Sequence, residues 1–187
     1  MLNTLKSLSI SGVSLKQLSV NNVLAWKEPA SFKNLVPLSV DANDNPYNGG
    51  LGYKNGYRVR SGGAEGEAST QVCTGFIPCK AGQTLYIYFP EPENGTSSVT
   101  SVNVTDGSKT NLGQLAYNGV YGIFQYSGAP TWNDYVTETN RVHKFTIPTN
   151  LADSSKIAFV RVTIQFQYTA LTTGEGLVVT VDEEITL

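Results

Sequence analysis

Alternating apolar and polar residues recur along the chain and predict short β-strands. The clearest strand covers 158–168, where every second residue from Ala158 to Tyr168 is apolar and the residues between them are mostly polar. One face of this strand should therefore pack in a core while the other meets water. Residues 84–89 and 177–181 repeat this alternation. Weaker strand signals lie at 36–40, 57–60, 72–77, 98–104, 120–126 and 142–147.

Clusters of Gly, Pro, Asn, Asp and Ser separate these runs, and no stretch keeps a helical period. Short strands without long helices between them favour two antiparallel sheets packed face to face over a parallel architecture. The predicted fold is all-β: an antiparallel β-sandwich of jelly-roll type, preceded by a short N-terminal β segment. Residues 131–140 stay open between a loop and a single helical turn.

A near-repeat opens the chain. Residues 5–13 read LKSLSISGV and residues 15–23 read LKQLSVNNV, so apolar and turn positions coincide in the two copies. The chain is expected to reverse twice and form three very short strands, which cannot bury a core alone. Residues 1–28 are therefore predicted to be an assembly or attachment segment that folds against the body of the chain or against other subunits.

A break in the pattern at 29–31 separates this segment from the sandwich, which is predicted over 32–187. A homotrimer is the favoured assembly, because three copies of the short strands could close a small core that one copy cannot. The apolar residues expected to make these contacts are Leu5, Leu8, Ile10, Leu15, Leu18, Val20 and Trp26.

Composition limits the partners of the chain. With 187 residues, 40% of them hydrophobic, the chain is long enough for one sizeable domain and an appendage. A formal net charge of −2 gives no long-range field to attract nucleic acid or an anionic membrane. No apolar run approaches the roughly 20 residues that cross a bilayer, and the first residues lack the pattern of a secretory signal. Synthesis and assembly in a cytoplasm are therefore expected.

Cys73 and Cys79 are the two cysteines of the chain. A straight strand would separate them by roughly 20 Å, far beyond the reach of a disulfide, so two unpaired and buried thiols are expected. His143 is the single histidine, which argues against a zinc site built from His and Cys. Its place between Val142 and Lys144 in a predicted strand favours a surface position.

Asp41, Asn43, Asp44 and Asn45 supply oxygen donors at a spacing similar to the start of a calcium loop. The glutamate that closes such a loop is missing, because Gly52 stands at that position. Clusters of Asp and Asn are also ordinary turn chemistry. A plain turn is favoured over a cation site here, and no metal or cofactor is expected elsewhere.

Aromatic residues are dense between 117 and 135, with amide and carboxylate side chains among them. Exposed rings beside such groups match the flat C–H faces and hydroxyls of sugars, but rings also fill cores and subunit interfaces. Glycan contact, subunit contact and core or loop packing all stay open for this stretch, since position in the fold decides between them. The candidate carbohydrate-binding residues are Tyr117, Tyr121, Tyr126, Trp132 and Tyr135.

Paired carboxylates could serve glycoside hydrolysis if they lay about 5–10 Å apart. The candidate pairs are Glu91 with Glu93 and Asp134 with Glu138, and an acidic run ends the chain at 182–184. Each of these is more simply a solvated charge. The sequence contains no Gly-x-Ser-x-Gly elbow and no phosphate loop. A non-enzymatic protein is therefore predicted.

The segments between residues 34 and 82 carry a resemblance to a known family. NLVP at 34–37, DANDNPYNG at 41–49, GYKNGYR at 52–58 and TGFIP at 74–78 resemble a module of structural proteins in tailed bacteriophages that infect Gram-positive bacteria. The opening repeat and the run at 179–185 are similar to elements of the same group. The resemblance implies a carbohydrate-binding-module type sandwich in a tail, baseplate or head-fibre protein.

The function that this resemblance implies is that of a non-enzymatic virion surface protein, assembled in the host cytoplasm and held to other capsid or tail proteins by its N-terminal segment. The sandwich would attach to host cell-wall or capsular polysaccharide, where many weak sites on one particle combine through avidity. The alternative is a purely structural capsid or tail decoration or adaptor protein that binds no glycan. A depolymerase is the third hypothesis.

Overall fold

The structure is a computed structural model that describes residues 8–10, 13–15, 17–20, 23–27, 32–89, 96–117, 120–124, 137–139, 142–151, 153–167 and 174–185. The chain divides into two compact units. One unit comprises Met1–Ser31 with Thr186–Leu187, and the other comprises Phe32–Ile185.

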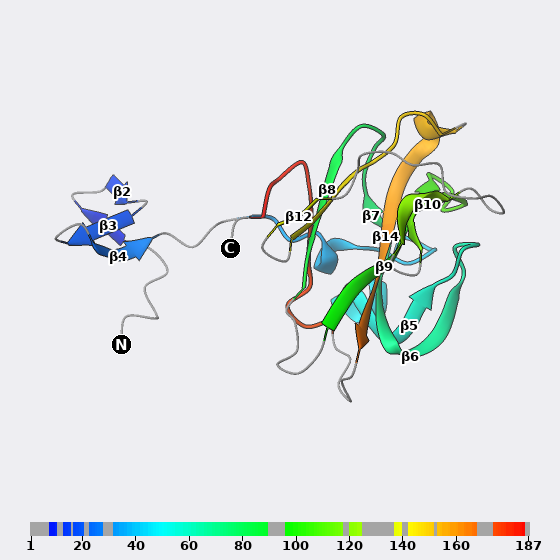
Figure 1. Ribbon diagram of the computed structural model, residues 1–187, viewed down its shortest axis with the longest axis horizontal. Helices are drawn as coiled ribbons and strands as arrows, with labels where there is room; N and C mark the ends of the chain where they lie inside the picture. Colours follow the sequence, from blue (N-terminus) through cyan, green and yellow to red (C-terminus); the bar gives the residue numbers. More distant parts are fainter. Residues whose placement is uncertain are drawn as a thin grey trace. The chain divides into compact units, whose positions relative to one another are not determined.

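The N-terminal unit contains two antiparallel hairpins (Figure 1). In the first, β1 (Leu8–Ile10) pairs with β2 (Val13–Leu15). In the second, β3 (Gln17–Val20) pairs with β4 (Val23–Lys27). The expectation of three strands was wrong, because the described residues of this unit form four strands in two separate two-stranded sheets. Each copy of the sequence repeat therefore supplies the first strand of its own pair, β1 in one copy and β3 in the other.

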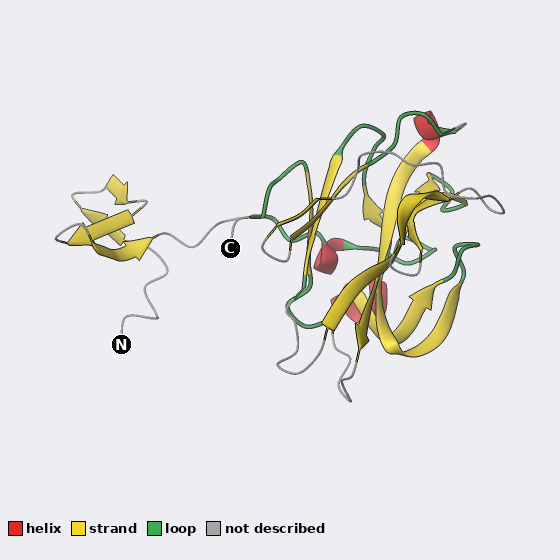
Figure 2. Ribbon diagram, in the orientation of Figure 1, coloured by secondary structure: helices red, strands yellow, loops and turns green. Residues whose placement is uncertain are grey.

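The larger unit is built from two antiparallel sheets (Figure 2). One is seven-stranded, with six strands in the order β11 (Val120–Phe124), β10 (Asn111–Tyr117), β9 (Thr96–Asp106), β14 (Ile157–Gln167), β6 (Glu65–Thr74) and β5 (Tyr53–Val59), while β7 (Ile77–Pro78) also pairs with β14. The other is four-stranded, in the order β12 (Thr137–Thr139), β13 (Val142–Thr146), β8 (Thr84–Tyr88) and β15 (Val178–Val181). Short 3-10 turns lie at η1 (Val36–Leu38), η2 (Tyr47–Gly50) and η3 (Ser154–Lys156).

A single apolar core lies between the two sheets. Val102 and Val162 enter it from the seven-stranded sheet, and Ile87 and Phe145 enter it from the four-stranded sheet, all with no exposed surface. Burying each such side chain contributes about 1.5–3 kcal/mol. The prediction of an all-β fold with two antiparallel sheets is confirmed, and packing across this core makes it a sandwich.

Two strand predictions differ from the structure for local reasons. Residues 36–40 form the η1 turn, because Pro37 lacks the N–H that a ladder needs and the side chain of Asn34 accepts the N–H of Val36 at 3.0 Å. The strand predicted at 72–77 is two strands, since Gly75 interrupts it. A Cβ atom added at Gly75 would lie 2.6 Å from the Cβ of Tyr47, so only glycine fits at this position.

The outer face of the seven-stranded sheet is covered at Arg161 and Thr163, which corrects the expectation that these residues of 158–168 meet water. Arg161 is 3% exposed and Thr163 is 1% exposed. The β5–β6 hairpin folds across this face, so that the N–H of Val59 donates to Thr163 Oγ1 at 3.0 Å. The sheet therefore has buried side chains on both faces, apolar ones toward the core and polar ones under the β5–β6 hairpin.

His143 is also buried, contrary to the predicted surface position. It is 5% exposed and its ring stacks on Phe89, with 5.2 Å between centroids and 13° between planes. Its neighbour Val142 is also buried, at 8% exposed, so β13 is covered on both faces at that point, which the alternation of the sequence does not reveal.

Candidate functional site

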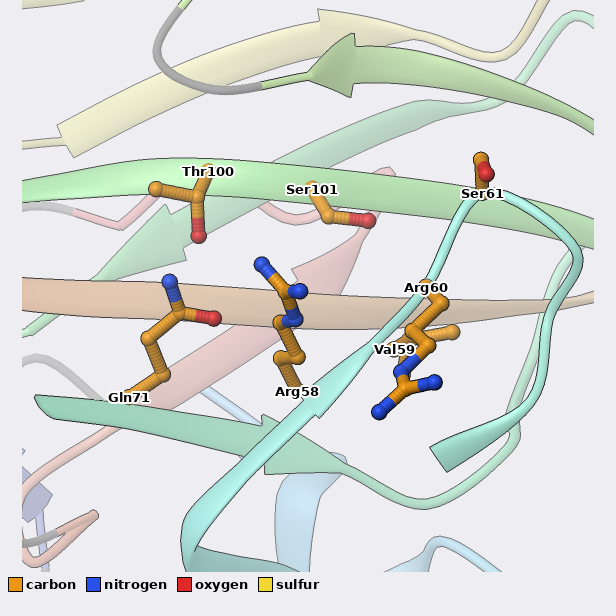
Figure 3. A pocket seen from close by; sticks show the side chains of 7 residues that line it. All are labelled: Arg58, Val59, Arg60, Ser61, Gln71, Thr100 and Ser101. Carbon is orange, nitrogen blue, oxygen red and sulfur yellow. The ribbon is translucent and has the colours of Figure 1, made fainter. Parts of the chain in front are cut away.

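A polar pocket opens on the covered outer face of the seven-stranded sheet (Figure 3). Its volume is about 150 Å³. It lies where the end of β5 and the following turn cross over β6 and β9. The lining residues are Arg58, Val59, Arg60, Ser61, Gln71, Thr100 and Ser101.

The floor of the pocket is buried and offers oxygen acceptors. Gln71 is 8% exposed, and its amide nitrogen donates to Gln165 Oε1 at 3.4 Å. The other amide atom, Gln71 Oε1, has no hydrogen-bond partner among the described residues. Thr100 Oγ1 donates its proton to the carbonyl of Thr163 at 3.2 Å, which leaves only lone pairs for a ligand.

The third floor residue, Ser101, is held in the same way. Its hydroxyl donates to Asn103 Oδ1 and accepts from Gln114 Nε2, the latter at 3.2 Å. Because Gln114 Nε2 also lies 3.3 Å from Asn103 Oδ1, the three side chains form a closed buried network. Ser101 is therefore fixed in orientation and faces the pocket with an acceptor.

The rim carries positive charge. Arg58 and Arg60 are exposed, and neither forms an ion pair with a carboxylate of the described residues. Figure 3 shows the guanidinium of Arg58 reaching toward Thr100 and Ser101, whereas Arg60 extends the other way. Arg60 lies against Gly66, where an added Cβ would stand 2.2 Å from its Nε. Arg58 is thus the cation that faces the pocket.

Three side chains from the sheet hold the wall that carries these arginines. Thr163 accepts the N–H of Val59, as described above. Asn103 Nδ2 donates to the carbonyl of Arg60 at 3.2 Å, and Asn111 Nδ2 donates to the carbonyl of Ser61 at 2.8 Å. The segment 59–61 is therefore fixed to β14, β9 and β10, and the pocket is preformed in the protein.

A second polar cluster lies nearby but is suited to structure rather than chemistry. Glu65 Oε1 accepts from Arg161 Nη2 at 2.6 Å and from the hydroxyl of Tyr47 at 2.9 Å. Burial alone would raise the pKa of Glu65, but the hydrogen bond and charge of Arg161 outweigh it and hold that pKa below its ordinary range. Burial raises the pKa of Tyr47 and of Cys73, so both stay neutral, and an ionised carboxylate paired with arginine is a poor base.

The aromatic candidates are only partly within the described residues. Tyr117 ends β10 and Tyr121 lies in β11, where the two backbones are neighbours through the pairs Ala116 with Tyr121 and Tyr117 with Val120. Tyr126, Trp132 and Tyr135 lie outside the described residues. The prediction that these rings contact glycan stays a prediction.

The assembly candidates lie in the two N-terminal hairpins, except Leu5, which is outside the described residues. The strand register pairs Leu8 with Leu15 in the first hairpin and Leu18 with Trp26 in the second. Ile10 ends β1 and Val20 ends β3.

The Asp41 loop is a hydrogen-bonded turn. Asp41 Oδ1 accepts the backbone N–H groups of Asn43 at 2.7 Å and Asn45 at 3.0 Å. These bonds, that of Asn45 first, lower the pKa of Asp41. Asp44 pairs with Lys109 Nζ at 2.6 Å. The part of the chain that the structure describes holds no cluster of three or more His, Cys, Asp or Glu arranged for a metal ion.

None of the remaining candidates that lie within the described residues lines the pocket. Cys73 and Cys79 are free and buried, as predicted. Glu91, Glu93 and Asp134 lie outside the described residues, and Glu138 is in β12. The acidic run at 182–184 contributes Asp182, whose Oδ1 accepts the N–H of Thr84 at 2.7 Å. That carboxylate therefore fastens β15 to β8.

Sequence reasoning missed the pocket residues. Arg58, Gln71, Thr100 and Ser101 come from three strands and carry no common spacing or motif. The signal available was the run of small polar residues in β9, which is unusual for a strand with core on one face. These residues of β9 line a pocket only because the β5–β6 hairpin, which is distant in sequence, crosses over them.

Comparison of the chain with protein-family models, with curated proteins and with solved structures gave no match. Among the helices of the described residues, none has the length and apolar character needed to span a membrane. Any inference about function therefore depends on the geometry of the chain itself.

Proposed function

We propose that this protein is a non-enzymatic surface protein of a tailed-phage virion, in which the sandwich attaches to a host cell-surface glycan. Its N-terminal segment, residues 1–28, joins the protein to other virion proteins or to further copies of itself. The polar pocket at Arg58, Gln71 and Thr100 is the proposed place where one saccharide unit binds.

The observation that carries the glycan proposal is the side chain of Gln71, which lines the pocket and whose buried Oε1 lacks a hydrogen-bond partner among the described residues. A buried polar atom of this kind costs about 1–3 kcal/mol when it stays unpaired. Sugars carry many O–H donors, so a sugar hydroxyl can satisfy it. The residues that line the pocket include no carboxylate, histidine or cysteine, so the lining itself supplies binding groups and no general base.

The two N-terminal hairpins support the assembly role. An isolated two-stranded hairpin is marginally stable in water, and its edges leave N–H and C=O groups free to pair. The hairpins belong to separate sheets among the described strands, so neither extends the other. Three copies could combine their strands into a small core, which makes a trimer the favoured state.

A purely structural decoration or adaptor protein is the second candidate. The same hairpins favour it, because assembly alone would explain them. In that case the pocket would have no saccharide ligand, and the protein would bind tightly to capsid or tail proteins only.

Glycan-array binding of the full chain tests the proposal against this alternative. We expect binding to host cell-wall or capsular polysaccharide, with reduced binding of Arg58→Gln. A chain that binds no glycan but binds capsid or tail proteins would favour the structural role. Product release from polysaccharide would contradict the non-enzymatic assignment. Analytical ultracentrifugation at micromolar concentration tests the trimer, and a monomer would exclude it.

A further inference from the structure

We infer that the pocket selects a saccharide unit carrying a negative charge, with a sugar hydroxyl donating to the floor and the anionic group held by Arg58. This inference deepens the proposed function and rests on it. It names the class of sugar that the pocket takes, namely one that is both hydroxylated and anionic.

The floor requires a ligand that donates hydrogen bonds. Gln71 Oε1 is an unpartnered acceptor within the described residues. The hydroxyl protons of Thr100 and Ser101 already go to Thr163 O and Asn103 Oδ1. The hydroxyls of Thr100 and Ser101 therefore offer the pocket only oxygen lone pairs, and the amide of Gln71 adds an unpartnered acceptor beside its N–H groups. An ion without O–H groups would leave Gln71 unsatisfied, whereas a sugar would not.

The rim requires a ligand that accepts hydrogen bonds and carries negative charge. Arg58 is exposed, reaches over the floor (Figure 3), and lacks an ion pair with the described carboxylates. The nearby carboxylate of Glu65 is occupied by Arg161 at 2.6 Å and approached by Lys54 at 3.5 Å. A guanidinium has five N–H donors arranged to pair with a carboxylate or phosphate. A neutral sugar would use only part of this capacity.

The size of the pocket limits the ligand to one small unit. About 150 Å³ is well below the roughly 300–1,000 Å³ of pockets for drug-sized ligands. It is also well above the ~10–15 Å³ that a single water needs. Uronic acids and sugar phosphates share the required chemistry, because both combine hydroxyls with an anionic group.

Four probes separate the two requirements in the full-length protein. Glucose has hydroxyls without charge, sulfate has charge without O–H groups, and glucuronate and glucose 6-phosphate have both. Titrations followed by NMR shifts of the side-chain N–H groups of Gln71 and Arg58 give the affinities. We expect at least one of the two hydroxylated anions to bind ten-fold or more tightly than glucose and than sulfate. The better of the two identifies the anionic group as carboxylate or phosphate.

Variants locate the binding in the pocket. Arg58→Gln should lower the affinity for the better anion about ten-fold, to the level of glucose. Lys144→Gln removes the same charge from an exposed position on β13 of the other sheet and should leave the affinity unchanged. Gln71→Met, which keeps the chain length but removes the acceptor, should also weaken binding. Thermal unfolding of each variant checks that the fold persists.

Each other outcome overturns the inference. Equal binding of glucose and glucuronate would remove the role of charge while leaving glycan attachment intact. Equal binding of sulfate and the sugar anions would remove the role of the hydroxyl. Absence of binding by all four probes, or full affinity in Arg58→Gln, would exclude the pocket. The glycan array then tests attachment separately, through whichever surface carries it.

Discussion

Arg161 Nη2 lies 2.6 Å from Glu65 Oε1, although the two residues are 96 positions apart in the chain. Arg161 is 3% exposed and points from the centre of the seven-stranded sheet into its outer layer, where its guanidinium carbon lies 4.7 Å from the ring centre of Phe76. The ion pair therefore fastens the beginning of β6 to the middle of β14. The ion pair thereby holds the β5–β6 hairpin against the sheet, and residues 59–61 of this hairpin form the wall of the pocket.

Replacing Glu65 should destabilise the sandwich. Glu65→Gln leaves the Arg161 cation buried without its carboxylate, and we expect the free energy of unfolding to fall by about 1–3 kcal/mol, less than for a fully buried pair because the Glu65 side chain is 29% exposed. Urea denaturation measures this. Lys54→Gln removes the exposed partner of the same carboxylate and should change stability by less than about 0.5 kcal/mol. Equal losses in the two variants would contradict the role given to Arg161.

The same pair gives the protein an acid-dependent component of stability. The pKa of Glu65 is below its ordinary value of 4.5 in the folded protein, so its contribution is present above about pH 4.5 and disappears as the pH falls through the folded value. The difference in unfolding free energy between the natural protein and Glu65→Gln should therefore shrink from pH 6 toward pH 3. A difference that stays constant across this range would show that the carboxylate charge is not involved.

The wall of the pocket depends on one buried hydroxyl. Thr163→Val removes the acceptor of the Val59 N–H and should cost about 1–3 kcal/mol. It should also weaken ligand binding, since the wall at 59–61 loses one of its three attachments. The matched control is Thr105→Val, because Thr105 Oγ1 is buried with no partner among the described residues. That change should be neutral or stabilising in urea denaturation. A similar loss in both variants would assign the effect to packing alone.

Gly52 is expected to tolerate no side chain. Its φ is +77°, and an added Cβ would stand 1.8 Å from the carbonyl oxygen of Val36. Gly52→Ala should lower stability by about 3 kcal/mol or more, because positive φ and a backbone clash act together. Gly107→Ala meets no atom within 4 Å and should stay within about 0.5 kcal/mol. Thermal unfolding compares the two variants.

The two thiols should be protected in the native state. Burial raises the pKa of Cys73 and raises that of Cys79 to about 12, so the reactive thiolate is scarce at pH 8. Ellman's reagent should modify neither cysteine in buffer and both in urea. Rapid native labelling of either residue would contradict its burial.

Periodicity predicted the elements that have an apolar face toward the core and a run of β-branched residues, such as β14, β8 and β15. It missed β10. It also missed the first half of β6, where the small residues Gly66 and Ala68 weaken the alternation of apolar and polar positions. It also predicted that Arg161 and His143 are exposed to solvent. Alternation shows that a residue is polar, but it does not show whether another segment covers that residue. The crossing of the β5–β6 hairpin over the sheet decides that for Arg161, and the packing of Phe89 decides it for His143.

The pocket was beyond prediction for the same reason. Gln71 and Thr100 are unremarkable polar residues in their own strands, and Arg58 resembles any exposed cation. Their function as a group depends on contacts between segments tens of residues apart, held by Asn103 and Asn111. The turn at Asp41, in contrast, follows from local spacing and was favoured from the sequence.

The central place of β14 decides when the sandwich can close. This strand pairs with both β6 and β9, yet it comes after them in the chain and ends at Gln167. During synthesis, the edges of β6 and β9 that pair with β14 stay unpaired until residue 167 has left the ribosome. Folding of this unit is therefore dominated by contacts between distant segments, which makes it slow. The nascent chain is a natural client for chaperones during that interval.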